Sequence, residues 1–305
     1  MFRHLLIPLD GSRLAEAALP PAALLAQRLG AQVTLMHVIE RNPPEEIHGE
    51  RHLQAEQEAC DYLADQADQA FPPEIKVNRH VHTEEVTNVA RSIVEHTGEL
   101  SPDLIVMCTH GKAGAREWMT GSIAQQIIGH GRTPVLLIRP QDSGETPTTQ
   151  FARILVALDG KSEHEFSLPI AFDLAAQLQS ALRLVMVVPT LETLTGKQAA
   201  SGKLLPGTTT QLLEINEEWA RNYLLQHAQH GSDLNLETSI EVRRGDPAQQ
   251  IVQAANAFNT DLIVLTTHGK AGIGAFWAGS TAPRIVGYTH IPLLLVPAEA
   301  PTPAP

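Results

Sequence analysis

The sequence predicts an α/β protein of two tandem domains, each with a five-stranded parallel sheet that is doubly wound by helices on both faces. Short apolar runs of strand length alternate with longer helix-like segments, which is the order expected for parallel strands joined by right-handed crossovers. The order then restarts, because the apolar run at 154–158 and the Asp-Gly pair after it repeat the run at 5–9 and its Asp-Gly pair. A length of 305 residues with 43% hydrophobic residues is sufficient for two cores.

In the first half, five segments have the apolar pattern of a buried strand, at residues 4–9, 33–39, 75–81, 104–108 and 135–138. Segments with a helical pattern lie between them, at about residues 12–30, 50–70 and 84–96 and from about 122 onward. We expect Ser12 to cap the first helix and Gly30 to end it, and Pro20-Pro21 must kink or split it.

The two domains are expected at residues 1–140 and 151–298. The stretch between them, residues 141–150, is polar, contains Gly and Pro, and lacks apolar periodicity, so it is predicted to be a linker. The Pro-rich tail at 299–305 is expected to be disordered.

The second half is longer than the first. Asp159 follows Asp10 by 149 residues, whereas His268 follows His110 by 158, so nine residues are added between these landmarks. We expect them in a long loop at residues 190–210, because the Gly, Ser, Thr and Pro content there is typical of loops.

Composition excludes several classes of function. The formal charge of -12, with 34 acidic and 22 basic residues, leaves no basic face for a nucleic-acid backbone or a polybasic membrane anchor. No apolar run reaches the roughly 18 residues of a spanning helix. Two cysteines are too few for a disulfide framework, so a reducing cytoplasm is expected. The 14 histidines form no HExxH motif or Cys/His cluster, and no metal site is expected.

A Gly-rich motif occurs once in each half. THGKAG spans residues 109–114 and again 267–272, and a Gly-Ser pair follows at 121–122 and at 279–280. A Gly-rich turn between a buried strand and a helix N-terminus can bind phosphate, because backbone N–H groups and the helix dipole point at the anion. The alternative is that the Gly-Ser pairs only begin and cap a helix.

Polar and apolar residues at the strand ends complete a nucleotide-like pattern. Asp10 and Asp159 end the first strand of each half, and Val38 and Val187 lie at the end of the second. The carboxyl ends of parallel strands form the usual ligand edge of such sheets. A carboxylate there can accept hydrogen bonds from an exocyclic amine or a ribose, and a branched apolar side chain can cover a purine. The alternative is that both Asp-Gly pairs only form turns.

These features together resemble the universal stress protein family. The resemblance covers nearly the whole chain and depends on LLIPLDGS and ILVALDGK, GAQVTLMHV, RRGDPAQQI and both THGKAG blocks with their Gly-Ser pairs. It implies a sheet order of 3-2-1-4-5 and an ATP pattern, Gly-x2-Gly-x9-Gly-Ser/Thr, whose later glycines match both halves. The first glycine of the pattern is replaced by Cys108 and by Thr266, where a side chain can crowd the approach of the backbone to the ligand.

The resemblance implies that ATP, with or without Mg²⁺, binds in one or both domains and that no prosthetic group is needed. The implied nucleotide-binding residues are Pro8, Asp10, Val38, Met107, His110, Gly111, Gly114, Gly121, Ser122, Ile123, Ala157, Asp159, Val187, Leu265, His268, Gly269, Gly272, Gly279, Ser280 and Thr281. It also implies a role in stress-response regulation, self-association of the two halves, a homodimer, and an unidentified protein partner.

Three functions stay open at this point. The first is a nucleotide-binding regulator, and the second is a nucleotide-independent scaffold that acts through protein–protein interaction, which the residues at 108 and 266 favour. The third, an enzyme that adenylates a substrate, is disfavoured because neither an SGGxDS-like loop nor a HIGH-like sequence is present. We assign no catalytic residue, and slow ATP hydrolysis or autophosphorylation at Ser122 or Ser280 stays open.

Overall fold

A computed structural model describes residues 2–47, 50–109, 123–140, 150–194, 196–267 and 281–298. The chain falls into two compact units, which are described separately. The first comprises Met1–Gln150, Thr267–Gly279 and His290–Pro305, and the second comprises Phe151–Thr266 and Ser280–Thr289. The predicted linker at 141–150 lies, except for Gln150, outside the described residues, as does the tail at 299–305. The boundaries at 140 and 151 therefore stay a prediction.

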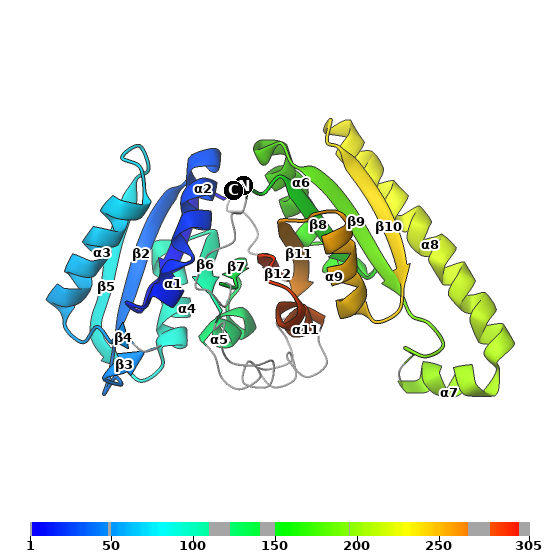
Figure 1. Cartoon of the computed structure of the whole chain (residues 1–305), viewed down its shortest axis with the longest axis horizontal. Helices are drawn as coiled ribbons and strands as arrows, with labels where there is room; N and C mark the ends of the chain where they lie inside the picture. Colours follow the sequence, from blue (N-terminus) through cyan, green and yellow to red (C-terminus); the bar gives the residue numbers. More distant parts are fainter. Residues whose placement is uncertain are drawn as a thin grey trace. The chain divides into compact units, whose positions relative to one another are not determined.

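The first unit contains the predicted doubly wound sheet (Figure 1). Its parallel strands are β1 (His4–Pro8), β2 (Gln32–Glu40), β5 (Val77–Val86), β6 (Leu104–Cys108) and β7 (Val135–Ile138). They lie in the order β5-β2-β1-β6-β7, which is the 3-2-1-4-5 order of the family. Strand β12 (Leu293–Pro297) also belongs to this unit and pairs antiparallel with β7.

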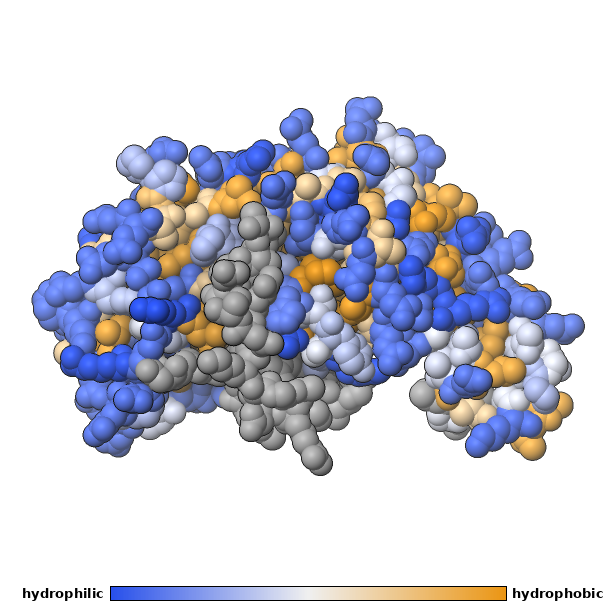
Figure 2. Space-filling model, viewed as in Figure 1, coloured by the Kyte–Doolittle hydropathy of each residue, from blue (hydrophilic) through white to orange (hydrophobic). Residues whose placement is uncertain are grey.

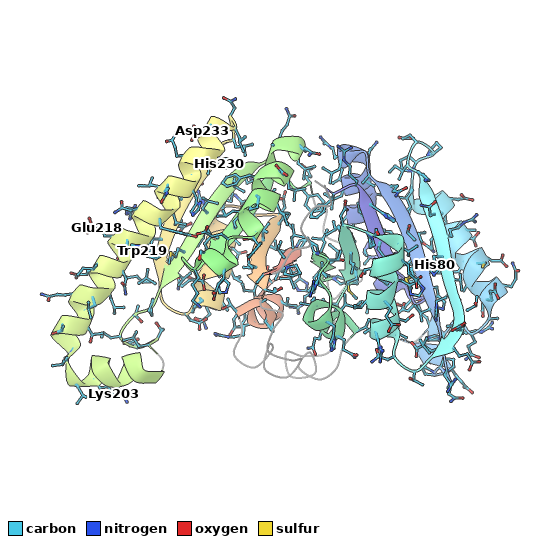
Figure 3. The ribbon with its side chains drawn as sticks, turned by 180° about the vertical axis from the view of Figure 1, so that it is seen from behind. His80, Lys203, Glu218, Trp219, His230 and Asp233 are labelled. Atoms are coloured by element: carbon cyan, nitrogen blue, oxygen red, sulfur yellow. The ribbon has the colours of Figure 1, made fainter. Side chains whose placement is uncertain are left out.

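Helices cover both faces of this sheet. They are α1 (Arg13–Glu16), α2 (Leu19–Leu29), α3 (Glu56–Ala70), α4 (Val89–Leu100) and α5 (Ile123–His130), and a short hairpin of β3 (Glu46–Ile47) and β4 (Glu50–Arg51) precedes α3. Helices α2 and α3 pack on each other and on the sheet, whereas α4 packs on α5 and on β2. Figures 1 and 3 view these two helical layers from opposite sides.

Local sequence signals set the ends of these helices as predicted. The Ser12 hydroxyl accepts a hydrogen bond from the Ala15 amide and caps α1. Gly30 ends α2 in the left-handed conformation, which glycine adopts at no steric cost. The predicted first helix is split into α1 and α2, and Pro20 and Pro21 stand in the first turn of the second helix, where a missing N–H costs least.

The second unit repeats the first four strands of this arrangement. Its parallel strands are β8 (Arg153–Leu158), β9 (Ala181–Val188), β10 (Thr238–Arg244) and β11 (Leu262–Thr267), in the order β10-β9-β8-β11. Its helices are η1 (Ser162–His164), α6 (Ser167–Leu178), α7 (Gly196–Leu204), α8 (Pro206–Asp233), α9 (Pro247–Ala257) and α11 (Thr281–Tyr288). The α/β class with two similar domains is therefore confirmed.

The loop predicted at residues 190–210 is wrong. Of the described residues, 196–204 form α7 and those from 206 onward begin α8, which is 28 residues long. Leu213, Ala220 and Leu224 of α8 are buried at spacings of seven and four, which place them on one face of the helix. Packing of this face stabilises a helix that the local Gly, Ser and Thr content does not favour.

The core of each unit is formed by its central strands. Leu5, Leu6 and Ile7 of β1 are 0% exposed, as are Ile154 and Leu155 of β8. Such continuous burial is typical of parallel strands with helices on both sides. Among the described helices, none is both long enough and apolar enough to cross a membrane.

Exposed large hydrophobic side chains gather in the second unit. All those found among the described residues lie between residues 166 and 288. Four of them, Leu204, Leu205, Leu212 and Ile215, are 54–80% exposed at the end of α7, between α7 and α8, or early in α8. Figure 2 shows hydrophobic surface over this region, at the lower right. An exposed apolar group of this kind is a feature of surfaces that bind other molecules.

Candidate functional site

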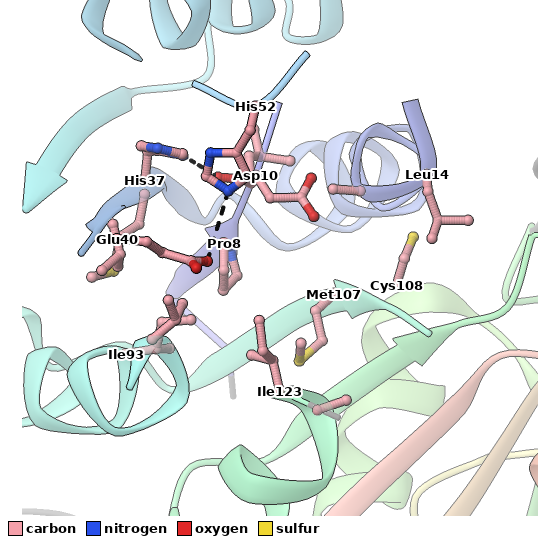
Figure 4. Close-up of a pocket in the computed structure, with 16 residues that line it drawn as sticks. Pro8, Asp10, Leu14, His37, Glu40, His52, Ile93, Met107, Cys108 and Ile123 are labelled. Atoms are coloured by element: carbon pink, nitrogen blue, oxygen red, sulfur yellow. Dashed lines mark hydrogen bonds and ion pairs between the residues drawn. The ribbon is translucent and has the colours of Figure 1, made fainter. Parts of the chain in front are cut away.

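A pocket opens at the carboxyl ends of β1, β2 and β6 in the first unit (Figure 4). Five of the residues expected there from the sequence line it, namely Pro8, Asp10, Val38, Met107 and Ile123. They come from the end of β1, the turn after it, β2, β6 and the start of α5. Parallel strands bring these separate sequence positions together because their carboxyl ends share one edge of the sheet.

Most of the other lining side chains are apolar. Leu14 of α1, Met36 of β2, and Val89 and Ile93 of α4 contribute hydrophobic surface from both sides of the sheet edge. An apolar pocket with a few converging polar groups is the usual form of a small-molecule site.

Asp10 presents one carboxylate oxygen to this pocket. Its Oδ1 accepts hydrogen bonds from the Ser12 amide at 2.9 Å and the Ser12 hydroxyl at 2.6 Å. Among the described residues, no group donates a hydrogen bond to Oδ2. Ser12 is fully buried, so the carboxylate is fixed in position while one of its oxygens keeps its full acceptor capacity.

Three polar residues of the pocket were not predicted from the sequence, namely His37, Glu40 and His52. His52 and Glu40 come from different elements, and the distance from His52 Nε2 to Glu40 Oε1 is 3.7 Å. A signal for Glu40 was available, because it stands only two residues after Val38 at the end of the same strand. His52 carried no such signal, since its place depends on how the hairpin folds back.

The hairpin of β3 and β4 lies next to the turn that contains Asp10. The Glu50 carboxylate accepts a hydrogen bond from the Arg13 amide at 2.6 Å, and an added Cβ on Gly11 would lie 2.8 Å from Cγ of Leu53. These contacts hold the segment that follows β4 against the start of α1 and place His52 in the pocket lining.

Burial controls the protonation of two groups in the pocket. Desolvation lowers the pKa of His37 below its ordinary value, and the hydrogen bond between its Nδ1 and the Leu9 carbonyl only partly opposes this. Desolvation also raises the pKa of the Cys108 thiol, with a further contribution from the negative charge of Asp10. At neutral pH the imidazole and the thiol are therefore both uncharged, and the thiol is a poor nucleophile.

The equivalent carboxylate of the second half is already bound. Asp159 Oδ2 accepts a hydrogen bond from His164 Nδ1 at 2.7 Å, and the ammonium of Lys161 lies 3.5 Å from the same oxygen. Oδ1 accepts from the Lys161 amide at 3.1 Å. Because both oxygens have partners, Asp159 has less acceptor capacity for a ligand than Asp10.

Two further contacts distinguish the second half. The Thr266 hydroxyl, at the first-glycine position of the family pattern, donates to the His164 carbonyl and accepts from the Ser167 amide. The indole of Trp219, which belongs to α8 (Figure 3), lies against the turn after β8, since an added Cβ on Gly160 would come within 2.3 Å of its ring.

The other expected residues of the second half lie at the corresponding edge. Ala157 stands at the end of β8 and Val187 in β9, while Leu265 lies in β11 and Thr281 begins α11. The remaining expected residues lie outside the described part of the chain, in both Gly-rich stretches: His110, Gly111, Gly114, Gly121, Ser122, His268, Gly269, Gly272, Gly279 and Ser280. Among the described side chains, no cluster of three or more His, Cys, Asp or Glu residues has a geometry that could hold a metal ion.

Comparison with known proteins identifies the family. The model of the universal stress protein family matches residues 1–139 and again residues 150–297. The chain belongs to the universal stress protein family. Two matches in one chain agree with the internal repeat, and the second match includes β12, which the structure groups with the first unit.

Relatives that match over nearly the whole chain occur in mycobacteria. Universal stress protein Rv2623 of Mycobacterium tuberculosis is 25% identical over 312 residues, with 95% of each chain covered. A universal stress protein of Mycolicibacterium smegmatis is 22% identical, with 96% of each chain covered. Among solved structures, a universal stress protein from Archaeoglobus fulgidus has a TM-score of 0.61 at 16% identity and covers 96% of each chain. At this identity the last likeness shows the fold alone.

Proposed function

We propose that this universal stress protein is a cytoplasmic stress-response regulator that binds an adenine nucleotide, preferentially ATP, in the pocket of its first half. One observation carries the proposal, namely that Pro8, Asp10, Val38, Met107 and Ile123 line a single pocket. They are five of the ten residues expected in this half, the other five lying outside the described residues, and they supply the expected apolar cover and the carboxylate. The Gly-rich stretch after β6 is the expected phosphate ligand.

The two halves differ in their capacity for ligand. Asp10 keeps one oxygen without a described donor, whereas both oxygens of Asp159 have partners. A ligand in the second half must displace His164 or compete with it for the carboxylate, which costs binding free energy. We therefore propose one tight nucleotide site per chain, in the first half.

Calorimetric titration with ATP tests this proposal. The parent protein is expected to bind one ATP per chain. Asp10→Ala is expected to lose at least tenfold in affinity, because a hydrogen bond to a charged group contributes about 1.5–3 kcal/mol. Asp159→Ala is the matched control and is expected to bind like the parent. The Gly121→Val and Gly279→Val pair tests the Gly-rich stretches in the same way.

Two results would contradict the proposal. Protein that has been stripped of co-purified nucleotide and still shows no heat with ATP is not a nucleotide-binding protein. A loss of affinity in Asp159→Ala equal to that in Asp10→Ala would remove the difference between the halves. Thermal unfolding of each variant shows whether it is folded, since Asp10 also holds Ser12.

The alternative, a nucleotide-independent scaffold, is favoured by the exposed apolar side chains of α7 and α8. In this case the parent fails to bind nucleotide, and replacing Leu212 and Ile215 by serine leaves the fold intact but removes binding to other proteins. The expected homodimer is tested with the same samples by sedimentation at several protein concentrations.

A further inference from the structure

A second carboxylate lines the first-half pocket besides Asp10. Glu40 is the last residue of β2 and stands two residues after Val38. The pairing of β2 with β5 shifts register between Val38 and Glu40, and such irregularities often re-aim a side chain next to a binding site. Glu40 therefore enters the same pocket as Val38, the residue expected to cover a base.

The Glu40 carboxylate lacks a hydrogen-bond donor in the described part of the chain. His52 forms an ion-pair contact with it, but its Nε2 lies 3.7 Å from Oε1, beyond hydrogen-bond reach (Figure 4). The Glu40 side chain is only 29% exposed. A carboxylate that is mostly removed from water gains free energy when a ligand supplies the missing donor.

The other described polar side chains of the pocket do not supply the donor that the Glu40 carboxylate lacks. Oδ2 of Asp10 is a second acceptor, and no Lys or Arg is found in the described lining. The Nδ1 atoms of His37 and His52 are each hydrogen-bonded to a backbone carbonyl, of Leu9 and Leu53 respectively. In the neutral ring of His37 this leaves an acceptor nitrogen. The described side chains of the pocket therefore favour a ligand that is rich in N–H or O–H donors.

We propose that Glu40 determines base specificity by accepting a hydrogen bond from the exocyclic amino group of a 6-aminopurine. A 6-oxopurine presents a carbonyl oxygen at the same position, and two acceptors that face each other repel and leave the buried carboxylate without a partner. The inference rests on the proposed function, since it assigns the base edge of the same site. In the second half Pro189 stands at the position of Glu40, so base selection by this carboxylate is assigned to the first half.

The experiment compares ATP with ITP, which carries a 6-oxopurine. Both nucleotides are titrated into the parent protein, Glu40→Gln and Glu40→Ala, with Glu163→Gln as the matched control because Glu163 is 70% exposed in the second half. The parent is expected to bind ATP at least tenfold more tightly than ITP. Glu40→Gln is expected to reduce or reverse this ratio, because its amide can donate to the carbonyl of ITP. Glu163→Gln is expected to keep the parent ratio.

Several results would overturn the inference. Equal affinities of the parent for ATP and ITP show that the pocket does not read the amino group, and the proposed function survives. Equal losses for both nucleotides in Glu40→Gln and Glu40→Ala show a structural role for Glu40 without base selection. If the stripped parent binds neither nucleotide, the proposed function fails and the inference fails with it.

Discussion

At the scale of single residues, the turn after β8 depends on a glycine for two separate reasons. Gly160 has φ +77°, and an added Cβ would come within 2.3 Å of the Trp219 ring. Gly30 has φ +62° but nothing within 4 Å of an added Cβ. Comparing substitutions at these two positions therefore separates the stability cost of the backbone conformation from the cost of steric contact.

We expect Gly30→Ala to cost about 1 kcal/mol, which is the left-handed backbone term alone. Gly160→Ala is expected to cost about 1–3 kcal/mol more, because a rigid indole must move. Chemical denaturation of each variant measures the two costs. In a double-mutant cycle, Trp219→Ala should recover the additional part, and a cycle without coupling would show that the ring does not oppose the new methyl group.

The residues of the site differ in whether they can be predicted from the sequence. Asp10 and Val38 could be predicted because each stands at the end of an apolar run, and the sheet topology then brings strand ends together. His164 could not be predicted as the partner of Asp159, because their contact depends on the short helix η1. The side chain of Thr266 was known to replace a glycine, but its bonds to the backbone of His164 and Ser167 become evident only in the structure.

At the scale of elements, the N-terminus of α9 joins two helices of the second unit. Asp246 caps α9 by accepting from the Gln249 amide and also forms a bidentate ion pair with Arg284 of α11, at 2.7 and 2.9 Å. Burial alone would raise the pKa of Asp246, but the hydrogen bonds from Arg284 and the helix amides outweigh it and lower the pKa. In the first unit Asn88 caps α4 and bonds to Gln126 of α5.

Asp246→Asn therefore gives this junction the residue type found in the first half. It should keep the cap but weaken the ion pair, and cost about 0.5–1 kcal/mol. Asp246→Ala should remove both and cost about 1–3 kcal/mol. Denaturation midpoints of both variants and of Arg284→Gln provide the measurement. If Asp246→Ala is as stable as Asp246→Asn, the cap contributes nothing.

Helix ends were easier to predict than the region that precedes α8. Ser12, Gly30 and the Asp246-Pro247 pair set helix ends through their own backbone preferences and short-range hydrogen bonds. In residues 190–210, Pro206 in the first turn of α8 is such a signal, but the composition of the segment is otherwise typical of a loop. Their helical structure is stabilised by packing instead, and periodic burial on α8 depends on residues as far along the chain as Leu224.

At the scale of the whole molecule, three histidines of the first unit make its stability depend on pH. Burial lowers the pKa of His4, His37 and His80 below the ordinary 6.5. Neighbouring His96 and His82 lower that of His80 further, with ring centroids of His80 and His96 4.7 Å apart. Below pH 6.5 the unfolded chain binds these protons more readily than the folded chain, so the free energy of unfolding falls as the pH falls.

We expect this loss as the pH falls through the ordinary histidine value of 6.5 toward the lower pKa values of the folded chain. Burial raises the pKa of the Glu16 and Asp261 carboxyls and so acts in the opposite sense, but nearer their ordinary values of 4.5 and 3.8. Hydrogen exchange, corrected for the intrinsic pH dependence of the amide rate, gives opening free energies for β1 and β2 of the first unit and for β8 and β9 of the second.

The opening free energy of β1 and β2 should fall more than that of β8 and β9 over this range, because the three histidines pack within the first unit. His80→Leu, which removes one of the three histidines, should reduce the difference without removing it, since His4 and His37 remain. Equal losses in the two pairs of strands would assign the pH dependence to groups other than these histidines. If the difference is unchanged in His80→Leu, the contact of His80 with His96 does not contribute to the pH dependence of stability. His4 and His37 are then its source.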